Sequence, residues 1–181
     1  LLKQVKKVHF IGIGGAGMCP LAEIMLSLGY ELTGSDNNDT ETFRRIEKEG
    51  AKVFLGQKKE NISDDTELVI YTNAILKGNE ELDYAKANFP CFERADLLGA
   101  MSRIFTNCIG VCGTHGKTTT SSMITQVLLE AGLDPSAVIG GKLPAIDAYG
   151  RYGKSENFVC ESCEFNNTFL KMNPDIAVIL N

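Results

Sequence analysis

Two glycine-rich segments in this sequence carry residue types that bind phosphate groups. The first is Gly12–Gly17 (GIGGAG), which fits the pattern G-x-G-x-x-G. Glycines there allow a tight turn and close approach to a pyrophosphate, which the amides of a following helix then bind. Asp36 lies 19 residues after Gly17, where a carboxylate hydrogen-bonds a ribose hydroxyl. The segment predicts a site for NAD, FAD or a UDP-sugar, with a glycine turn needed only for packing as the alternative.

The second segment, Gly113–Thr120 (GTHGKTTT), contains the G-K-T sequence of phosphate-binding loops. Its upstream glycine lies closer to the lysine than in G-x-x-x-x-G-K-[ST], but the shorter loop can still surround phosphates with amides. Lys117 can reach the β- and γ-phosphates, and the Thr118 hydroxyl can ligate Mg²⁺. A magnesium nucleotide also needs a carboxylate at a neighbouring strand end. Glu161 directly follows an apolar run and is the best candidate, with Glu164 as a second.

Alternating apolar and amphipathic runs indicate the elements that hold these loops. We expect strands at 8–12, 31–34, 52–55, 68–71, 107–112, 157–160 and 175–180, and helices at 21–28, 40–49, 79–88, 95–103 and 117–131. The Gly- and Pro-containing region 140–154 is predicted to be a loop. This order predicts an α/β fold: a Rossmann-like parallel-sheet domain over 1–105, followed by the start of a P-loop α/β ATPase domain over 106–181. Only about three strands are expected in the second domain, whereas open sheets typically have about four to six. We therefore expect the chain to stop inside its second domain.

Composition excludes several other classes of protein. The chain has 181 residues, 44% of them hydrophobic, and a net charge of −5, so neither global disorder nor non-specific nucleic-acid binding is expected. No apolar run approaches the ~18 residues of a membrane span, and no signal peptide is evident, so no membrane partner is expected. The six cysteines are interpreted as reduced, cytoplasmic thiols. Cys160 and Cys163 have zinc-ligand spacing, but a structural role for both thiols is favoured.

The two loops together resemble those of the Mur ligases of peptidoglycan synthesis. The resemblance rests on HFIGIGGAGM at 9–18 and GTHGKTTT at 113–120, with further matches at 34–36 (GSD), 73–75 (NAI), 94–98 (RADLL) and 174–181 (PDIAVILN). It covers nearly all of the chain. It implies three domains, of which this chain would hold the first and the opening of the second. It also implies ATP-dependent joining of L-alanine to the carboxylate of UDP-N-acetylmuramate through an acyl phosphate.

The resemblance also assigns site residues. The UDP-substrate would contact Gly14, Gly15, Ala16, Gly17, Met18, Ser35, Asp36, Asn73, Ala74 and Arg94. ATP would contact Gly113, Thr114, His115, Gly116, Lys117, Thr118 and Thr119. The catalytic residues would be Lys117, Thr118, Glu161 and His115, with Mg²⁺ on Thr118 and Glu161 and His115 assigned by resemblance alone. One departure is Cys163, which stands where the family often has Asp. Because the amino-acid-binding domain would be absent, we expect the 181 residues by themselves not to catalyse the ligase reaction.

Two other functions remain open at this point. One is a nicotinamide-dependent oxidoreductase, based on Gly12–Gly17 and Asp36, although such an enzyme has no use for the G-K-T loop. The other is a P-loop ATPase with an interaction domain, although such proteins usually carry the longer loop. Titration with NADH and with UDP-N-acetylmuramate distinguishes an oxidoreductase from a ligase. Nucleotide hydrolysis that does not depend on muramate would favour the P-loop ATPase. The oligomeric state is not predicted.

Overall fold

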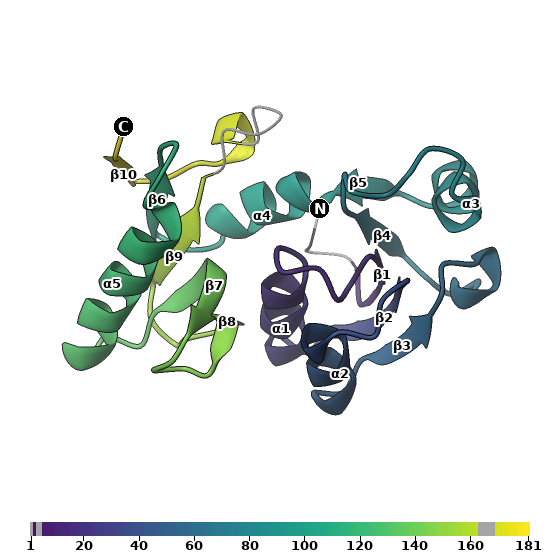
Figure 1. Cartoon of the computed structure of the whole chain (residues 1–181), viewed down its shortest axis with the longest axis horizontal. Coiled ribbons are helices and arrows are strands. Elements are labelled where there is room, and N and C mark those ends of the chain that lie inside the picture. Colours follow the sequence, from purple (N-terminus) through teal and green to yellow (C-terminus); the bar gives the residue numbers. More distant parts are fainter. Residues whose placement is uncertain (1, 3–4, 163–168) are drawn as a thin grey trace. The chain divides into compact units, whose positions relative to one another are not determined.

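The computed structural model describes residues 2, 5–162 and 169–181, and the chain folds as two compact units, Leu1–Leu97 and Leu98–Asn181 (Figure 1). Each unit contains its own five-stranded sheet with helices packed against it. The α/β fold class predicted from the sequence is therefore confirmed. No helix in the described part of the chain is long and apolar enough to cross a bilayer.

The first unit is a parallel sheet with strand order β3-β2-β1-β4-β5. Its elements are β1 (Lys7–Ile11), α1 (Cys19–Ser27), β2 (Glu31–Asp36), α2 (Glu41–Lys48), β3 (Lys52–Leu55), η1 (Lys59–Asn61), β4 (Leu68–Tyr71), α3 (Glu80–Asn88) and β5 (Cys91–Glu93), followed by α4 (Arg94–Ser102). The order reverses between β1 and β4. In doubly wound sheets, ligands bind outside the carboxyl ends of the strands at such a point.

Local sequence explains where two of these helices begin. The Thr40 side chain accepts a hydrogen bond from the Phe43 amide at 3.2 Å, and the Asn79 side chain accepts one from the Leu82 amide at 2.9 Å. Both residues are favoured helix caps because they satisfy amides that have no partner inside the helix.

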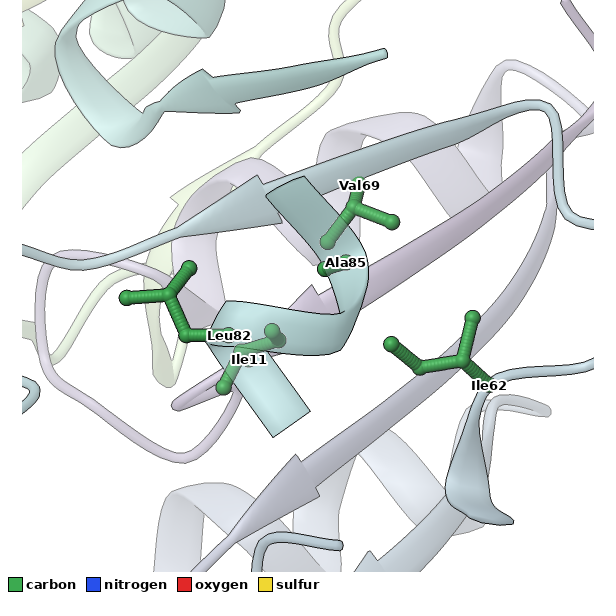
Figure 2. Packing of buried hydrophobic residues seen from close by; sticks show 5 residues of the cluster. All are labelled: Ile11, Ile62, Val69, Leu82 and Ala85. Atoms are coloured by element: carbon green, nitrogen blue, oxygen red, sulfur yellow. The ribbon is translucent and has the colours of Figure 1, made fainter. Parts of the chain in front are cut away.

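Helix α3 covers one face of the first sheet with a small apolar cluster. Figure 2 shows Leu82 and Ala85 of α3 facing Ile11 of β1 and Val69 of β4, with Ile62 at the side. Each of these side chains is at most 9% exposed. At about 25 cal/mol per Å² of apolar surface removed from water, such burial is what holds the helix on the sheet.

The second unit has strand order β10-β6-β9-β7-β8. Its elements are β6 (Asn107–Cys112), α5 (Lys117–Glu130), β7 (Ser136–Leu143), β8 (Ala148–Arg151), β9 (Asn157–Glu161) and β10 (Ile176–Ile179). The pair β7–β8 is antiparallel, and the other pairs are parallel. The α5 residues Ile124 and Leu128 pack on a buried cluster that includes Ile109, Ala137 and Val159 from three neighbouring strands.

Two expectations for this unit, the loop at 140–154 and a sheet of about three strands, are wrong. The segment 140–154 is largely the hairpin β7–β8, so the sheet has five strands where about three were expected. The predicted strand near the end of the chain is β10, and it pairs with β6. In the first unit, strand β5, of three residues, was not predicted. The glycines that suggested a loop at 140–154 instead permit close backbone approach, as at Gly153, where a Cβ would lie 2.2 Å from the Asp134 carbonyl oxygen.

Candidate functional site

The first glycine loop begins where β1 ends, at the point where the strand order reverses. Gly12 has φ +86°, and a Cβ there would lie 2.7 Å from the Thr72 methyl carbon at the end of β4. The amides of Gly12 and Ile13 donate to the Ser35 carbonyl oxygen at 2.8 and 3.0 Å. The loop is therefore fixed to the carboxyl end of β2 on one side and lies against β4 on the other.

Asp36 holds the middle of this loop through its carboxylate. Its Oδ2 accepts a hydrogen bond from the Gly14 amide and its Oδ1 one from the Asn38 amide, both at 3.0 Å. The Thr42 hydroxyl donates to the Gly14 carbonyl oxygen. Asp36 is 9% exposed and Gly14 is buried. The Gly14 amide is thus already engaged, and contacts of Gly14 and Asp36 with a ligand stay predictions.

The part of the loop that faces solvent is Gly15–Gly17. Ala16 is exposed, and within the described chain no acceptor is found for the amides of Ala16 and Gly17. A Cβ at Gly17 would lie 3.3 Å from Arg94 Cδ and 3.4 Å from its Nε. Backbone donors, the start of α1 and a guanidinium therefore come together, and this combination suits an anion.

The remaining predicted substrate residues divide into exposed and buried ones. Asn73 and Ala74 are exposed just after β4, and the Asn73 side-chain amide donates to Glu93 Oε2 at 3.3 Å. Met18 and Ser35 are buried beneath the loop, at 1% and 0% exposure. We expect Met18 and Ser35 to support the conformation of the loop, since their side chains are buried.

A buried polar network lies under the same loop and was not predicted. Glu81 of α3, fully buried, accepts from the Ser35 hydroxyl at 2.5 Å and from the Asn61 side-chain amide at 3.1 Å. His9 Nε2 lies 3.1 Å from Glu81 Oε1, and its Nδ1 lies 2.7 Å from the Thr33 hydroxyl. All the polar atoms of this carboxylate are therefore partnered, as a buried charge requires.

The second glycine loop joins β6 to α5. Gly113 and Gly116 have φ +135° and +84°, which favours glycine at both positions. Lys117 Nζ donates to the Gly113 carbonyl oxygen and approaches that of Thr114 at 3.4 Å. The lysine therefore lies over its own loop. Thr118 is exposed in the first turn of α5, and its amide has no acceptor in the parts that the structure describes.

Asn181 braces this loop from the end of β10. Its side-chain oxygen accepts from the amides of Thr114 and His115 at 2.9 and 3.1 Å. The side chain of His115 is exposed. Two loop amides are therefore held by a side chain, while the amides of Gly116, Thr118 and Thr119, at the start of α5, lack acceptors in the described ranges.

Glu161, Thr118 and Gly140 surround one space at the carboxyl ends of β9 and β7. Glu161 Oε1 accepts from the Gly140 amide at 2.7 Å and from the Ser121 hydroxyl at 3.1 Å. A Cβ placed on Gly140 would lie 2.8 Å from Glu161 Oε2 and 3.0 Å from Thr118 Oγ1. A carboxylate and a hydroxyl beside the phosphate loop are the oxygen ligands that Mg²⁺ prefers, so these residues fit the predicted metal.

The cysteines of the second unit do not form a metal site in the described ranges. Cys108 and Cys160, on adjacent strands, have their sulfur atoms 3.9 Å apart. The hydrogen bond with Cys108 and burial raise the pKa of the Cys160 thiol well above its ordinary value. Among described residues, no group of three His, Cys, Asp or Glu side chains is arranged to hold a metal. Cys163 and Glu164 lie outside the described residues.

Several residues of the site were missed from the sequence. Gly140, Ser121, Asn181 and Glu81 each bond to a predicted site residue or its support. A signal existed for Gly140, because the pair Gly140-Gly141 follows the apolar run 137–139, as a phosphate-type turn follows a strand. No pattern in the sequence links Glu81 to Ser35, since helix and strand meet only in the folded unit.

Comparison with known families assigns both units. Residues 7–106 match the Mur ligase family, catalytic domain, and residues 111–181 match the Mur ligase middle domain. The chain belongs to the Mur ligase family. The resemblance noted in the sequence is thereby confirmed.

Two curated relatives of this Mur ligase chain are named UDP-N-acetylmuramate–L-alanine ligase. The protein of Clostridium kluyveri is 50% identical over 177 residues, which are 97% of this chain and 39% of that protein. The protein of Clostridium perfringens is 45% identical over 183 residues, 100% of this chain and 40% of that protein. The chain thus spans about two fifths of the length of these relatives.

Solved Mur ligase structures share the fold. The UDP-N-acetylmuramate-alanine ligase of Thermotoga maritima has a TM-score of 0.89 at 30% identity, covering 96% of this chain and 40% of that one. The UDP-N-acetylmuramate:L-alanyl-gamma-D-glutamyl-meso-diaminopimelate ligase of Neisseria meningitides has a TM-score of 0.86 at 28% identity, covering 97% and 60%. These likenesses confirm the predicted Rossmann-like first sheet followed by the P-loop ATPase fold.

Proposed function

We propose that this chain supplies the UDP-substrate-binding and ATP-binding parts of a ligase that joins L-alanine to the carboxylate of UDP-N-acetylmuramate. The reaction would pass through an acyl phosphate and serve peptidoglycan precursor synthesis in the cytoplasm. The observation that carries the proposal is that Thr118 and Glu161 lie around one space beside the G-K-T loop of the second unit, while the sheet of the first unit carries its own anion-binding loop. The names of the relatives supply the substrates.

In the first unit, the diphosphate of the UDP-substrate would lie on the loop at Ala16 and Gly17. Their amides lack acceptors in the described chain, and Arg94 lies against Gly17. Charge-assisted hydrogen bonds of this kind are roughly twice as strong as neutral ones. Asn73 and Ala74, exposed just after β4, would contact the same ligand.

In the second unit, the loop 113–119 would bind the phosphates of ATP. Lys117 would leave its loop carbonyls to contact the β- and γ-phosphates, and the exposed His115 would lie beside them. Thr118 and Glu161 would hold Mg²⁺, which offsets the negative charge as the substrate carboxylate approaches the γ-phosphate. Residues 1–105 would thus form the UDP-substrate-binding domain, and residues 106–181 would form part of the ATP-binding domain.

Calorimetric titration of the purified chain tests the first half of this proposal. We expect UDP-N-acetylmuramate to bind and NADH not to bind. Arg94→Ala is expected to weaken binding of the UDP-substrate by about tenfold, because a hydrogen bond to a charged group is worth about 1.5–3 kcal/mol. Arg44→Ala is the matched control, since Arg44 is an exposed arginine paired with Asp39 and Glu47 in the same unit. Binding of NADH in preference to the UDP-substrate would contradict the proposal.

A further inference from the structure

We propose that Gly140 is a positioning residue for the magnesium–nucleotide site. Its amide would orient the Glu161 carboxylate, and its lack of a side chain would keep open the space that Glu161 shares with Thr118. The inference rests on the proposed ATP- and Mg²⁺-binding function and assigns a role to a residue outside the phosphate loop.

The first observation is the direction of the Glu161 carboxylate. Its Oε1 accepts two hydrogen bonds, from the Gly140 amide of β7 and from the Ser121 hydroxyl of α5, which is fully buried. No donor to Oε2 is found in the described part of the chain. Strand and helix together therefore fix one oxygen and leave the other directed at the space beside Thr118, where a cation would bind.

The second observation is the size of that space. A Cβ on Gly140 would lie 2.8 Å from Glu161 Oε2, 3.0 Å from Glu161 Oε1 and 3.0 Å from Thr118 Oγ1. Three oxygen atoms thus lie at less than normal contact distance from one methyl position. Any side chain at Gly140 must displace the carboxylate, the hydroxyl or both, which are the two oxygens proposed to ligate Mg²⁺.

Gly140 is not required by its backbone conformation, because its φ lies outside the left-handed region. Glycine inside a strand weakens the strand by about 0.5–1 kcal/mol relative to alanine, so its presence there calls for another reason. The space next to Glu161 and Thr118 is that reason. Groups that orient a metal ligand typically change metal affinity by about 10–100-fold when they are altered.

The neighbouring glycine provides a matched control. A Cβ on Gly141 would approach only the Thr118 methyl carbon, at 3.0 Å, and no oxygen of the proposed metal site. Gly141→Ala therefore adds the same methyl group to the same strand, one residue away. If the effect of Gly140→Ala came from strand packing alone, both variants would show it.

The experiment measures binding of Mn²⁺, as a paramagnetic probe for Mg²⁺, to the chain with a non-hydrolysable ATP analogue. Electron paramagnetic resonance gives the free Mn²⁺, and circular dichroism checks the fold. We expect Gly140→Ala to weaken Mn²⁺ binding about tenfold or more and Gly141→Ala to leave it close to wild type. Gly140→Ala is also made in the Glu161→Asp background, where the acidic side chain is one carbon shorter. We expect Gly140→Ala to reduce Mn²⁺ affinity less in this background than in the wild-type chain.

The outcomes separate this inference from the function on which it rests. If wild type binds no Mn²⁺–nucleotide, the proposed function of this unit fails, and the inference fails with it. If wild type binds and Glu161→Gln abolishes binding, but Gly140→Ala binds like wild type, the function stands and the inference is overturned. A Gly140→Ala chain that does not fold, or purely additive effects with Glu161→Asp, would also overturn it.

Discussion

The Ser35 hydroxyl donates to Glu81 Oε2 at 2.5 Å, and both side chains are fully buried. The backbone carbonyl of the same Ser35 accepts the amides of Gly12 and Ile13 in the first glycine loop. One residue therefore connects a buried carboxylate of α3 with the loop proposed to bind the UDP-substrate. Burying that carboxylate is tolerated because every oxygen has a donor, so loss of the carboxylate should be costly.

We predict that Glu81→Ala lowers the free energy of unfolding by at least about 3 kcal/mol, because it leaves several buried polar groups without partners at about 1–3 kcal/mol each. These groups are Ser35, Asn61 and His9. Urea denaturation measures the change. Glu80→Ala, at the neighbouring exposed position that pairs with Lys59, should change stability by less than about 0.5 kcal/mol. Equal effects at the two positions would contradict the role of the network.

Gly12→Ala tests the close approach of the first loop to β4. Gly12 and Gly29 both have φ +86°, but a Cβ at Gly29 would have nothing within 4 Å, whereas one at Gly12 would lie 2.7 Å from the Thr72 methyl carbon. Gly29→Ala should therefore cost only the left-handed backbone, about 1–2 kcal/mol. Gly12→Ala should cost a further 1–3 kcal/mol or so from overpacking, as measured by thermal or urea unfolding.

Removal of the Thr72 methyl group provides the check on that prediction. Thr72→Ser deletes the carbon that a Cβ at Gly12 would strike and keeps the hydroxyl. In this background, the extra cost of Gly12→Ala over Gly29→Ala is expected to shrink. An unchanged difference would show that the clash is not with Thr72.

Lys117→Met should weaken binding of MgATP by about 10–100-fold, because a charge-assisted bond to phosphate is worth about 1.5–3 kcal/mol. Lys117 Nζ donates to the Gly113 carbonyl oxygen and approaches that of Thr114, and circular dichroism checks that the variant keeps the fold. Lys154→Met, at an exposed position in the same unit, is the control. Calorimetry measures both, and similar affinities for the two variants would remove Lys117 from the nucleotide site.

The second unit should lose stability in acid, because protonation of Asp134 removes a stabilising interaction. The Lys154 amide, followed by the charge and hydrogen bond of Arg151, holds the pKa of Asp134 below its ordinary value of 3.8. The carboxylate therefore stabilises the fold in its charged form. That contribution is complete above the ordinary value and is lost as the pH falls through the lower pKa of the folded state.

The measurable consequence concerns Asp134→Asn. Its deficit in free energy of unfolding should be constant from about pH 7 to pH 5 and should close below about pH 4, where the wild-type carboxylate becomes protonated. Asp64→Asn, at an exposed position of the first unit, serves as the comparison. A deficit that persists unchanged into strong acid would mean that the charge of Asp134 is not its source.

Most strands and helices could be predicted because each has a local signal. The apolar run 8–11 before a glycine turn, or the Thr40 cap before an amphipathic stretch, is complete within a few residues. The hairpin β7–β8 could not be predicted in this way. Its strand β7 contains Gly140 and Gly141 and is stabilised by pairing with β9, about twenty residues further along the chain. Composition alone favours a loop there.

The sequence by itself determined the two glycine-rich loops and their places between strand and helix, and it predicted Lys117, Thr118 and Glu161 as site residues, because motif chemistry depends on residue types at short spacing. Only the tertiary structure decided what surrounds them. It placed Arg94 beside Gly17, Glu81 under Ser35 and Gly140 against Glu161. Such contacts join residues far apart in the chain, and they depend on strand order and on which faces pack together.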